Sequence, residues 1–236
     1  MRIFAIGDLH LPGGEEKPMD VFGSAWTDHP ARIKEAWCRT VREEDLVLVP
    51  GDISWAMTLE EAAEDLVYLG SLPGTVVIIR GNHDYWWQAI GKVRRALPPN
   101  VVALQNDHFA LPDGTAVCGT RGWDLPDDTA DPHDEKVYSR EVIRLELSLA
   151  SARAAGLQPR IVMLHYPPTT RDGRRTPITD LMEHNGVEHC VYGHLHGPAR
   201  SAGVRGQVRG VSYHLVACDA IAFTPVQVTQ VPCSSN

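Results

Sequence analysis

The sequence predicts an α/β protein in which parallel strands alternate with helices, and three observations lead to this architecture. Short runs of β-branched residues recur along the first hundred residues, and an amphipathic stretch follows each run. A β-α-β-α-β-α order of this kind gives parallel strands joined by right-handed crossovers. Five apolar runs along the chain also end in Asp, Asn or His. The carboxyl ends of parallel strands are where α/β proteins bind their ligands.

The first half of the chain contains three strand–helix units. We expect strands over residues 2–6, 46–49 and 75–79, and helices over 30–41, 58–69 and 85–96. Asp28 is in position to cap the first helix, whose first turn contains Pro30. Thr58 with Glu61 three residues later is a capping-box pattern that predicts the start of the second helix. Asp84 lies near the start of the third.

The second half of the chain has a different pattern of expected elements. Short strands are expected over 101–104, 109–111 and 116–118, with a hairpin turn at 112–115, which predicts a second, antiparallel or mixed sheet. The remaining expected elements are a helix over 135–154, a strand over 160–164, a helix over 178–183, a strand over 188–192, a hairpin over 204–217 that turns around Arg205-Gly206-Gln207, and an edge strand over 226–231. No repeat or interdomain linker interrupts the chain, so we expect residues 1–236 to form a single domain.

The composition excludes several classes of protein. The formal net charge of −8 disfavours a general nucleic-acid binder, which would be basic. The five cysteines are far apart and form no Cys-x-x-Cys pair, so we expect neither a zinc ribbon nor a disulfide framework but a reduced, cytoplasmic protein. No apolar stretch approaches the roughly 18 residues of a membrane helix, and the amino terminus does not have the pattern of a signal peptide.

The polar residues at the strand ends predict a site for two metal ions. The candidate ligands are Asp8, His10, Asp52, Asn82, His165, His194 and His196. A single catalytic zinc uses about three protein ligands, so seven groups fit two ions if one carboxylate bridges them. Asp52 is the natural bridge because it stands alone at the end of its strand. Each motif taken singly is commonplace, and a lone Asp-x-His or His165 would more often be a loop residue or a buried histidine.

The donor set also indicates which metal and which ligand it suits. Oxygen and nitrogen donors without a thiolate favour manganese, with iron and zinc as alternatives. Two divalent ions, two aspartates and a bridging hydroxide leave a centre of about +1, which suits a phosphate monoester or diester. Neutral Asn82, where a third aspartate would add negative charge, keeps that centre positive.

The strand ends carry five blocks of sequence that resemble the calcineurin-like metallophosphoesterases. The blocks are Gly7-Asp8-Leu9-His10, Gly51-Asp52, Gly81-Asn82-His83-Asp84, His165 and Gly193-His194-Leu195-His196. The resemblance implies a four-layer α/β/β/α sandwich of two mixed sheets flanked by helices. It also implies that Asp8, His10, Asp52 and His196 bind one metal and that Asp52, Asn82, His165 and His194 bind the other. His83 would then be the acid or the phosphate-contacting group, with Asp84 fixing its tautomer.

Two positions depart from the pattern of this family. Gly51-Asp52 is followed by Ile53-Ser54 where the protein Ser/Thr phosphatases have Asp-Arg-Gly, which indicates a bacterial-type phosphohydrolase outside that branch. Leu11 stands where many members have glycine, which reshapes the first loop.

These features favour an enzyme that hydrolyses a small phosphate ester, more specifically a diester such as a cyclic nucleotide. The attacking group would be a hydroxide held between two metals about 3.5–4 Å apart. A nuclease is an alternative that the acidic charge disfavours, and a non-catalytic scaffold is an alternative that the complete ligand set disfavours. We therefore expect a small phosphate ester as partner, and neither a membrane nor a stable nucleic-acid partner.

Two loops are expected beside the site. The arginines after His165, namely Arg171, Arg174 and Arg175, are candidates for a phosphate clamp, although a solvated loop fits them equally well. Residues 12–29 carry Lys17, Phe22 and Trp26 and contain five glycines and prolines, which disfavours a regular element. We expect this segment to form a rim or lid over the metals, the alternative being a static loop anchored to the core by its aromatic residues.

Overall fold

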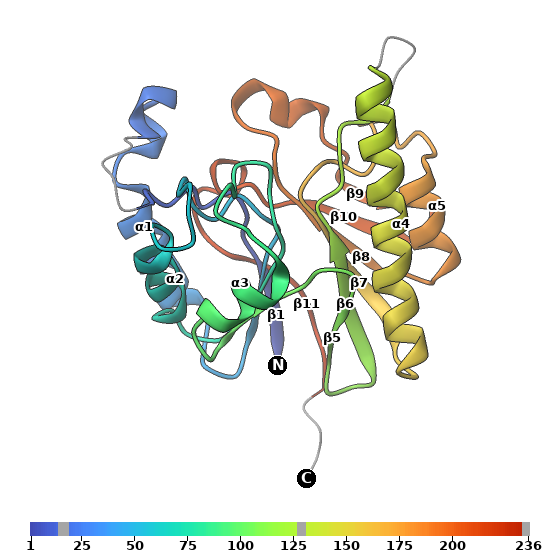
Figure 1. The fold of residues 1–236 in the computed structure, drawn as a ribbon, viewed down its shortest axis with the longest axis horizontal. Coiled ribbons are helices and arrows are strands. Elements are labelled where there is room, and N and C mark those ends of the chain that lie inside the picture. The colour runs from blue at the N-terminus through green and yellow to red at the C-terminus, as the bar shows by residue number, and fades with distance from the viewer. Residues whose placement is uncertain (14–18, 127–130, 233–236) are drawn as a thin grey trace.

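The computed structural model describes residues 1–13, 19–126 and 131–232, and it contains two sheets packed face to face with helices on both outer sides (Figure 1). The first sheet has the strand order β11-β1-β2-β3-β4. Its strands are β1 (Arg2–Ala5), β2 (Leu46–Val49), β3 (Thr75–Ile78), β4 (Val101–Ala103) and β11 (Val226–Gln230). All neighbours pair in parallel except β11, which runs antiparallel to β1.

The second sheet has the strand order β5-β6-β7-β8-β10-β9. Its strands are β5 (His108–Ala110), β6 (Thr115–Thr120), β7 (Gln158–Leu164), β8 (His189–Tyr192), β9 (Gly206–Val208) and β10 (Val211–Leu215). The four central strands are parallel, and the outer strands β5 and β9 pair antiparallel with β6 and β10. Both sheets are therefore mixed.

The helices cover the two outer faces of the pair of sheets. Helices α1 (His29–Thr40), α2 (Ala63–Gly70) and α3 (Ile90–Ala96) pack on the first sheet, and α4 (Pro132–Ala154) and α5 (Pro177–His184) pack on the second (Figure 1). Within the described residues, four short 3₁₀ helices lie in the loops, at Met19–Phe22 (η1), Ser24–Trp26 (η2), Gly197–Ala202 (η3) and Cys218–Ala220 (η4).

Successive side chains of a strand belong to different parts of the hydrophobic core. Val47 and Val49 belong to the core beneath the helices, whereas Leu46 and Leu48 belong to the core between the two sheets. Successive side chains of a strand point to opposite faces, so a strand buried on both faces is apolar throughout. The four-layer α/β/β/α sandwich expected from the resemblance is confirmed.

Several boundaries differ from the sequence-based expectations. Helix α2 begins at Ala63 rather than residue 58. Thr58 Oγ1 does accept the Glu61 N–H at 3.2 Å, but this bond caps a separate turn, in which the Glu61 carboxylate accepts the Met57 N–H at 2.8 Å. Helix α3 begins at Ile90 rather than residue 85. Asp28 does precede α1, but its side chain makes no capping hydrogen bond.

Two strand predictions also need correction. The last hairpin turns at Arg209-Gly210, where φ is +46° and +86°, and not at Arg205-Gly206-Gln207. Positive φ at both central residues is the requirement of a tight two-residue hairpin turn. The strand expected over 101–104 joins the first sheet, in parallel with β3, rather than the second.

None of the helices in the described ranges combines the length and the apolar character that crossing a membrane requires.

Candidate metal centre

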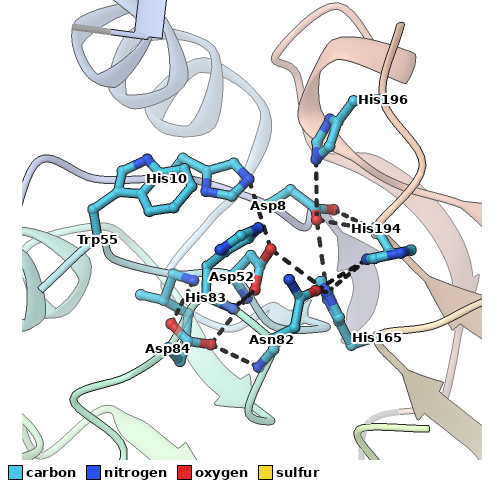
Figure 2. Close-up of polar contacts among 12 residues, drawn as sticks. Asp8, His10, Asp52, Trp55, Asn82, His83, Asp84, His165, His194 and His196 are labelled. Atoms are coloured by element: carbon cyan, nitrogen blue, oxygen red, sulfur yellow. Dashed lines mark hydrogen bonds and ion pairs between the residues drawn. The ribbon is translucent and has the colours of Figure 1, made fainter. Parts of the chain in front are cut away.

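The carboxyl ends of five strands meet at one edge of the sandwich and bring the predicted ligands together (Figure 2). Strands β1, β2 and β3 are consecutive neighbours in the first sheet, and β7 and β8 are neighbours in the second. The two sheets are joined at this edge because the Gly7 N–H, just after β1, donates to Val216 O at 2.7 Å, just after β10. Residues from distant parts of the chain therefore converge on one small volume.

Four candidate ligands have a backbone conformation that non-glycine residues rarely adopt. The φ angles of Asp8, His10, Asp52 and His194 are +57°, +44°, +52° and +71°. Each such residue costs roughly 1–3 kcal/mol and persists only where its surroundings fix it. The surroundings here are backbone hydrogen bonds between the first two loops, from Asp8 N to Gly51 O and from His10 N to Asp52 O, both 3.0 Å.

The first group of candidate ligands consists of Asp8, His10 and His196, with Asp52 at its edge. One ligand atom from each of Asp8, His10 and His196 lies within 4.8 Å of the other two. His196 Nε2 lies 3.4 Å from Asp8 Oδ1, and His10 Nε2 lies 3.7 Å from Asp52 Oδ2. Asp8, His10 and Asp52 are buried, so these groups face one another rather than solvent.

The second group consists of Asp52, Asn82, His165 and His194. His165 Nε2 lies 2.6 Å from Asn82 Oδ1 and 3.5 Å from Asp52 Oδ2. His194 Nδ1 lies 3.0 Å from Asn82 Oδ1 and 3.3 Å from His165 Nε2. Asp8 also reaches this group, since ligand atoms of Asp8, Asp52 and His165 lie within 4.8 Å of one another.

The hydrogen bonding of His165 shows that the residues present fit a metal ion. Its Nδ1 lies 3.0 Å from Pro50 O, and a carbonyl only accepts, so the proton of the neutral ring is on Nδ1. Its Nε2 is then an acceptor, and it faces Asn82 Oδ1, another acceptor in the orientation that the structure gives the amide. A cation among Asn82 Oδ1, His165 Nε2 and the neighbouring His194 Nδ1 would accept an electron pair from each of them.

Burial lowers the pKa of two candidate histidine ligands, and the neutral imidazole is the form that binds metal. Burial lowers the pKa of His10 well below its ordinary value and lowers that of His194 to about 4. His196 behaves differently, because Asp219 and Asp8 outweigh the effect of burial and raise its pKa to about 10. The two carboxyl groups diverge as well. Burial raises the pKa of Asp52, whereas the facing histidines overcome burial and lower the pKa of Asp8.

Asp84 has a different place from the one we expected. Its carboxylate accepts backbone N–H groups of Asp52 at 3.0 Å, Ile53 at 2.9 Å and Gly81 at 2.7 Å, and further N–H groups from Ser54 and the Trp86 indole. Its oxygens are therefore committed to the loops after β2 and β3, and the expectation that Asp84 fixes the His83 tautomer was wrong. Asp84 holds the two loops that present Asp52 and Asn82 to the site.

His83 is half-buried, and its ring lies 5.7 Å from that of His10. Its backbone N–H donates to Asp52 Oδ1 at 2.8 Å, which ties it to the candidate bridging carboxylate. Its buried Nδ1 has no hydrogen-bond partner among the described residues, and burial lowers its pKa. The ring borders the cavity next to the metal ligands.

That cavity has a volume of about 520 Å³ and an aromatic wall. Trp55 stacks on His10 with ring centroids 4.7 Å apart, and Trp26 meets His10 and His196 edge-on. Met19 and Ala25 also line it, so the segment expected to form a rim does border the site. Lys17 lies outside the described residues, and whether the segment acts as a lid stays a prediction.

Sequence reasoning missed Asp219. Its Oδ1 accepts from His196 Nδ1 at 2.9 Å and its Oδ2 accepts from Gly197 N at 2.9 Å, so it orients a candidate ligand. The signal was present, because Leu215-Val216-Ala217-Cys218 is one more apolar run that ends in Asp.

The three arginines after His165 do not form one clamp. Arg175 pairs with Asp180 and Glu183 at 3.1 Å each, and Arg174 donates to Pro126 O at 3.5 Å. Arg171 alone borders a cavity close to the site. The expectation of a joint phosphate clamp is therefore not supported for Arg175, whose charge is already compensated.

The comparisons with known proteins agree with this fold. A family profile described as calcineurin-like phosphoesterase matches residues 1–198. The chain therefore belongs to the calcineurin-like phosphoesterase family, and it is a hydrolase that acts on phosphoric esters. The comparison with curated proteins finds no match.

Two of the solved structures with a similar fold are bacterial proteins. The protein TT1561 of Thermus thermophilus has a TM-score of 0.60 at 11% identity, with 97% of this chain and 98% of that chain covered. The phosphopantetheinyl hydrolase PptH of Mycobacterium tuberculosis has a TM-score of 0.56 at 17% identity, with 98% and 96% covered. At these identities the likeness shows the fold alone.

Proposed function

We propose that this hydrolase uses two divalent cations, with manganese as the first choice, to hydrolyse small phosphodiesters such as cyclic nucleotides. Asp8, His10, Asp52 and His196 would hold one cation, and Asp52, Asn82, His165 and His194 the other. The observation that carries the proposal is the convergence of ligand atoms around His165 Nε2, with Asn82 Oδ1 at 2.6 Å, His194 Nδ1 at 3.3 Å and Asp52 Oδ2 at 3.5 Å. Two divalent ions, when bound, lower the pKa of a water molecule and polarise phosphoryl oxygens.

The chain's own residues take the remaining roles. His83 borders the cavity, and we assign it the donation of a proton to the leaving oxygen or the stabilisation of charge there. Asp84 is a positioning residue, since it binds the backbone of both loops that carry Asp52 and Asn82. Asp219 orients His196 in the same sense.

The dimensions of the site favour a small substrate. A cavity of about 520 Å³ is within the range of small-molecule sites, and Trp26 and Trp55 offer an apolar wall for an organic group. One protein of similar fold is named a phosphopantetheinyl hydrolase, which is compatible with a small organic phosphate ester here.

Metal analysis together with a generic diesterase assay tests the proposal. We expect about two metal ions per chain, and hydrolysis of bis(p-nitrophenyl) phosphate that chelation abolishes and Mn²⁺ restores. A panel of monoesters, diesters, cyclic nucleotides and single-stranded DNA then defines the substrate. Tight binding of two metals without hydrolysis of any ester would indicate a scaffold, and a preference for DNA would indicate a nuclease.

We also propose that residues 1–236 act as one domain in the cytoplasm. The family match ends at residue 198, but β10 and β11 beyond it pair with β8 and β1 inside it. Four cysteines in the described ranges are free thiols, which fits a reducing compartment; Cys233 lies outside those ranges.

A further inference from the structure

A second cavity, of about 720 Å³, adjoins the cavity at the candidate metal centre. The two cavities share Gly197, Pro198 and Arg200 as lining residues, so they are neighbours across the start of η3. Arg171 and Arg205 line the second cavity from two different loops. These loops are held side by side by a bridge between Thr170 and Gly203. We call this second space the arginine cavity.

Two of the three guanidinium groups in the arginine cavity, those of Arg171 and Arg205, have no carboxylate partner among the described residues. Three guanidinium groups and no carboxylate line it. Arg200 donates to Gly197 O at 2.8 Å and lies 3.7 Å from Asp219 Oδ2, which fixes its position. Arg171 and Arg205 are exposed, and neither pairs with a carboxylate in the part of the chain that the structure describes.

Two arginines near the arginine cavity, unlike Arg171 and Arg205, are paired with carboxylates. Arg175 pairs with Asp180 and Glu183, and Arg209 pairs with Glu183. The chain as a whole has 30 acidic and 22 basic residues, so carboxylates are plentiful. Guanidinium groups that share a cavity without a carboxylate are arranged to receive an anion, because Arg binds phosphate through several charge-assisted hydrogen bonds.

We infer that the arginine cavity binds a second phosphate group of the substrate, carried by the same organic group whose ester is cleaved at the metal centre. The inference rests on the proposed function. It narrows the substrate class to phosphate esters that carry a further phosphate. The organic group would lie along the aromatic wall formed by Trp26 and Trp55, which leads from His10 toward Pro198 and Arg200 in the shared lining.

Two chromogenic probes that differ only in the second phosphate test this inference. One is thymidine 5′-(p-nitrophenyl phosphate), and the other is the same compound with a 3′-phosphate. Both release p-nitrophenol from the same diester, so the chemical step is matched. We expect kcat/KM to be roughly ten-fold higher for the 3′-phosphorylated probe, mainly through a lower KM, because its extra interaction is one of binding.

The Arg171→Gln/Arg205→Gln double variant should reduce this preference to about one. The matched control is Arg95→Gln/Arg140→Gln, which removes two other exposed arginines that lie outside the arginine cavity and have no carboxylate partner among the described residues. The control should keep both the preference and the activity. Thermal melting of each variant shows whether it is folded. An equal loss of preference in the control would overturn the inference, since the effect would then come from overall charge.

Calorimetric binding provides a readout without turnover. Thymidine 3′,5′-bisphosphate should bind the wild-type protein roughly ten-fold more tightly than thymidine 5′-monophosphate, and the Arg171/Arg205 variant should lose this difference. A wild-type enzyme that hydrolyses the simpler probe but shows no preference in either assay would overturn the inference and leave the proposed function intact. A protein that holds no metal and hydrolyses neither probe would contradict the proposed function itself.

Discussion

Asp52 lies between the two groups of candidate ligands, and its replacement tests the pairing of the metals. Its Oδ2 is 3.7 Å from His10 Nε2 and 3.5 Å from His165 Nε2, while its Oδ1 accepts from the His83 N–H. We expect Asp52→Ala to abolish activity and to lower the metal content from two to one or none, because both ions lose a ligand. Elemental analysis measures this. Two tightly held metals in the variant would contradict the bridging role.

His83 offers a way to separate proton transfer from metal binding. It borders the cavity but belongs to neither group of ligands, so His83→Ala should keep both metals and lose turnover by on the order of 10²–10⁴-fold. The loss should be smaller for p-nitrophenyl esters, since p-nitrophenolate leaves without a proton. Equal losses for good and poor leaving groups would show that His83 holds charge or positions phosphate instead.

Asp219 is expected to tune metal affinity through His196. Because its carboxylate accepts from both His196 Nδ1 and Gly197 N, Asp219→Ala should weaken metal binding by roughly 10–100-fold. Asp219→Asn keeps one acceptor oxygen and should fall between the wild type and the alanine variant. Competition with a chelator gives the affinities. Identical affinities for all three proteins would rule out an orienting role.

The candidate ligands could be predicted from the sequence, whereas the residues that hold them could not. Asp8, Asn82 and His165 each follow an apolar run within three residues, and the carboxyl edge of a parallel sheet brings such positions together. The role of Asp84 depends on which N–H groups surround it, and three of these belong to a loop about thirty residues away. Nothing in the local sequence around Asp84 records that contact.

The strands of the first sheet could be predicted from the sequence, whereas the starts of two helices could not. Strands β1, β2 and β3 were predictable because they are buried on both faces, so all their residues except the leading Arg2 and Thr75 are apolar. The starts of α2 and α3 were not, because Thr58 caps a separate turn ahead of α2 and Asp84 uses its carboxylate for loop contacts. The capping signal at Thr58 therefore marked a turn rather than the helix itself, and at Asp84 the neighbouring loops competed for the same side chain.

The contact between Arg2 in β1 and Asp45, just before β2, predicts that the stability of the protein depends on pH. Asp45 is buried and accepts hydrogen bonds from Arg2 and from the Arg42 N–H. Burial opposes its charge, but these bonds outweigh burial and lower its pKa. The unfolded chain, with an ordinary pKa of about 3.9, therefore takes up the proton first as the pH falls. The stabilisation by ionised Asp45 is complete well above pH 4 and is lost as the pH falls through the folded-state pKa.

Urea unfolding of wild type and Asp45→Asn at several pH values measures this effect. The free energy of unfolding should differ most between the two proteins at neutral pH, and the difference should shrink toward pH 3. Glu35→Gln is a suitable control, because Glu35 forms only an exposed pair with Arg39 in α1. A difference that stayed constant or grew on acidification would show that Asp45 does not act through its charge.

The arrangement of the two sheets was only partly predictable. Consecutive β-α units fix the neighbours β1, β2 and β3, but the placement of β4 in the first sheet and the pairing of β8 with β10 are contacts between separate segments. Short runs of three to five residues carry no information on which sheet they join. The resemblance to a known family, and not the periodicity, supplied the four layers.

Strand β11 tests whether the residues beyond the family match are part of the same folding unit. It covers the edge of β1, the strand that leads into Asp8 and His10, and Val231 after it is buried between the sheets. Val226, Val228 and Val231 together contribute roughly 3–5 kcal/mol of apolar burial.

Because 1 kcal/mol corresponds to a shift of about 2–4 °C at this size, a chain of residues 1–224 should melt about 10 °C lower than the wild type and hold less metal. A chain of residues 1–232 keeps β11 and should match the wild type in both measurements. If the 1–224 chain melted and bound metal like the wild type, β1 would not need its edge partner, and the carboxyl-terminal strand would not belong to the domain that forms the site.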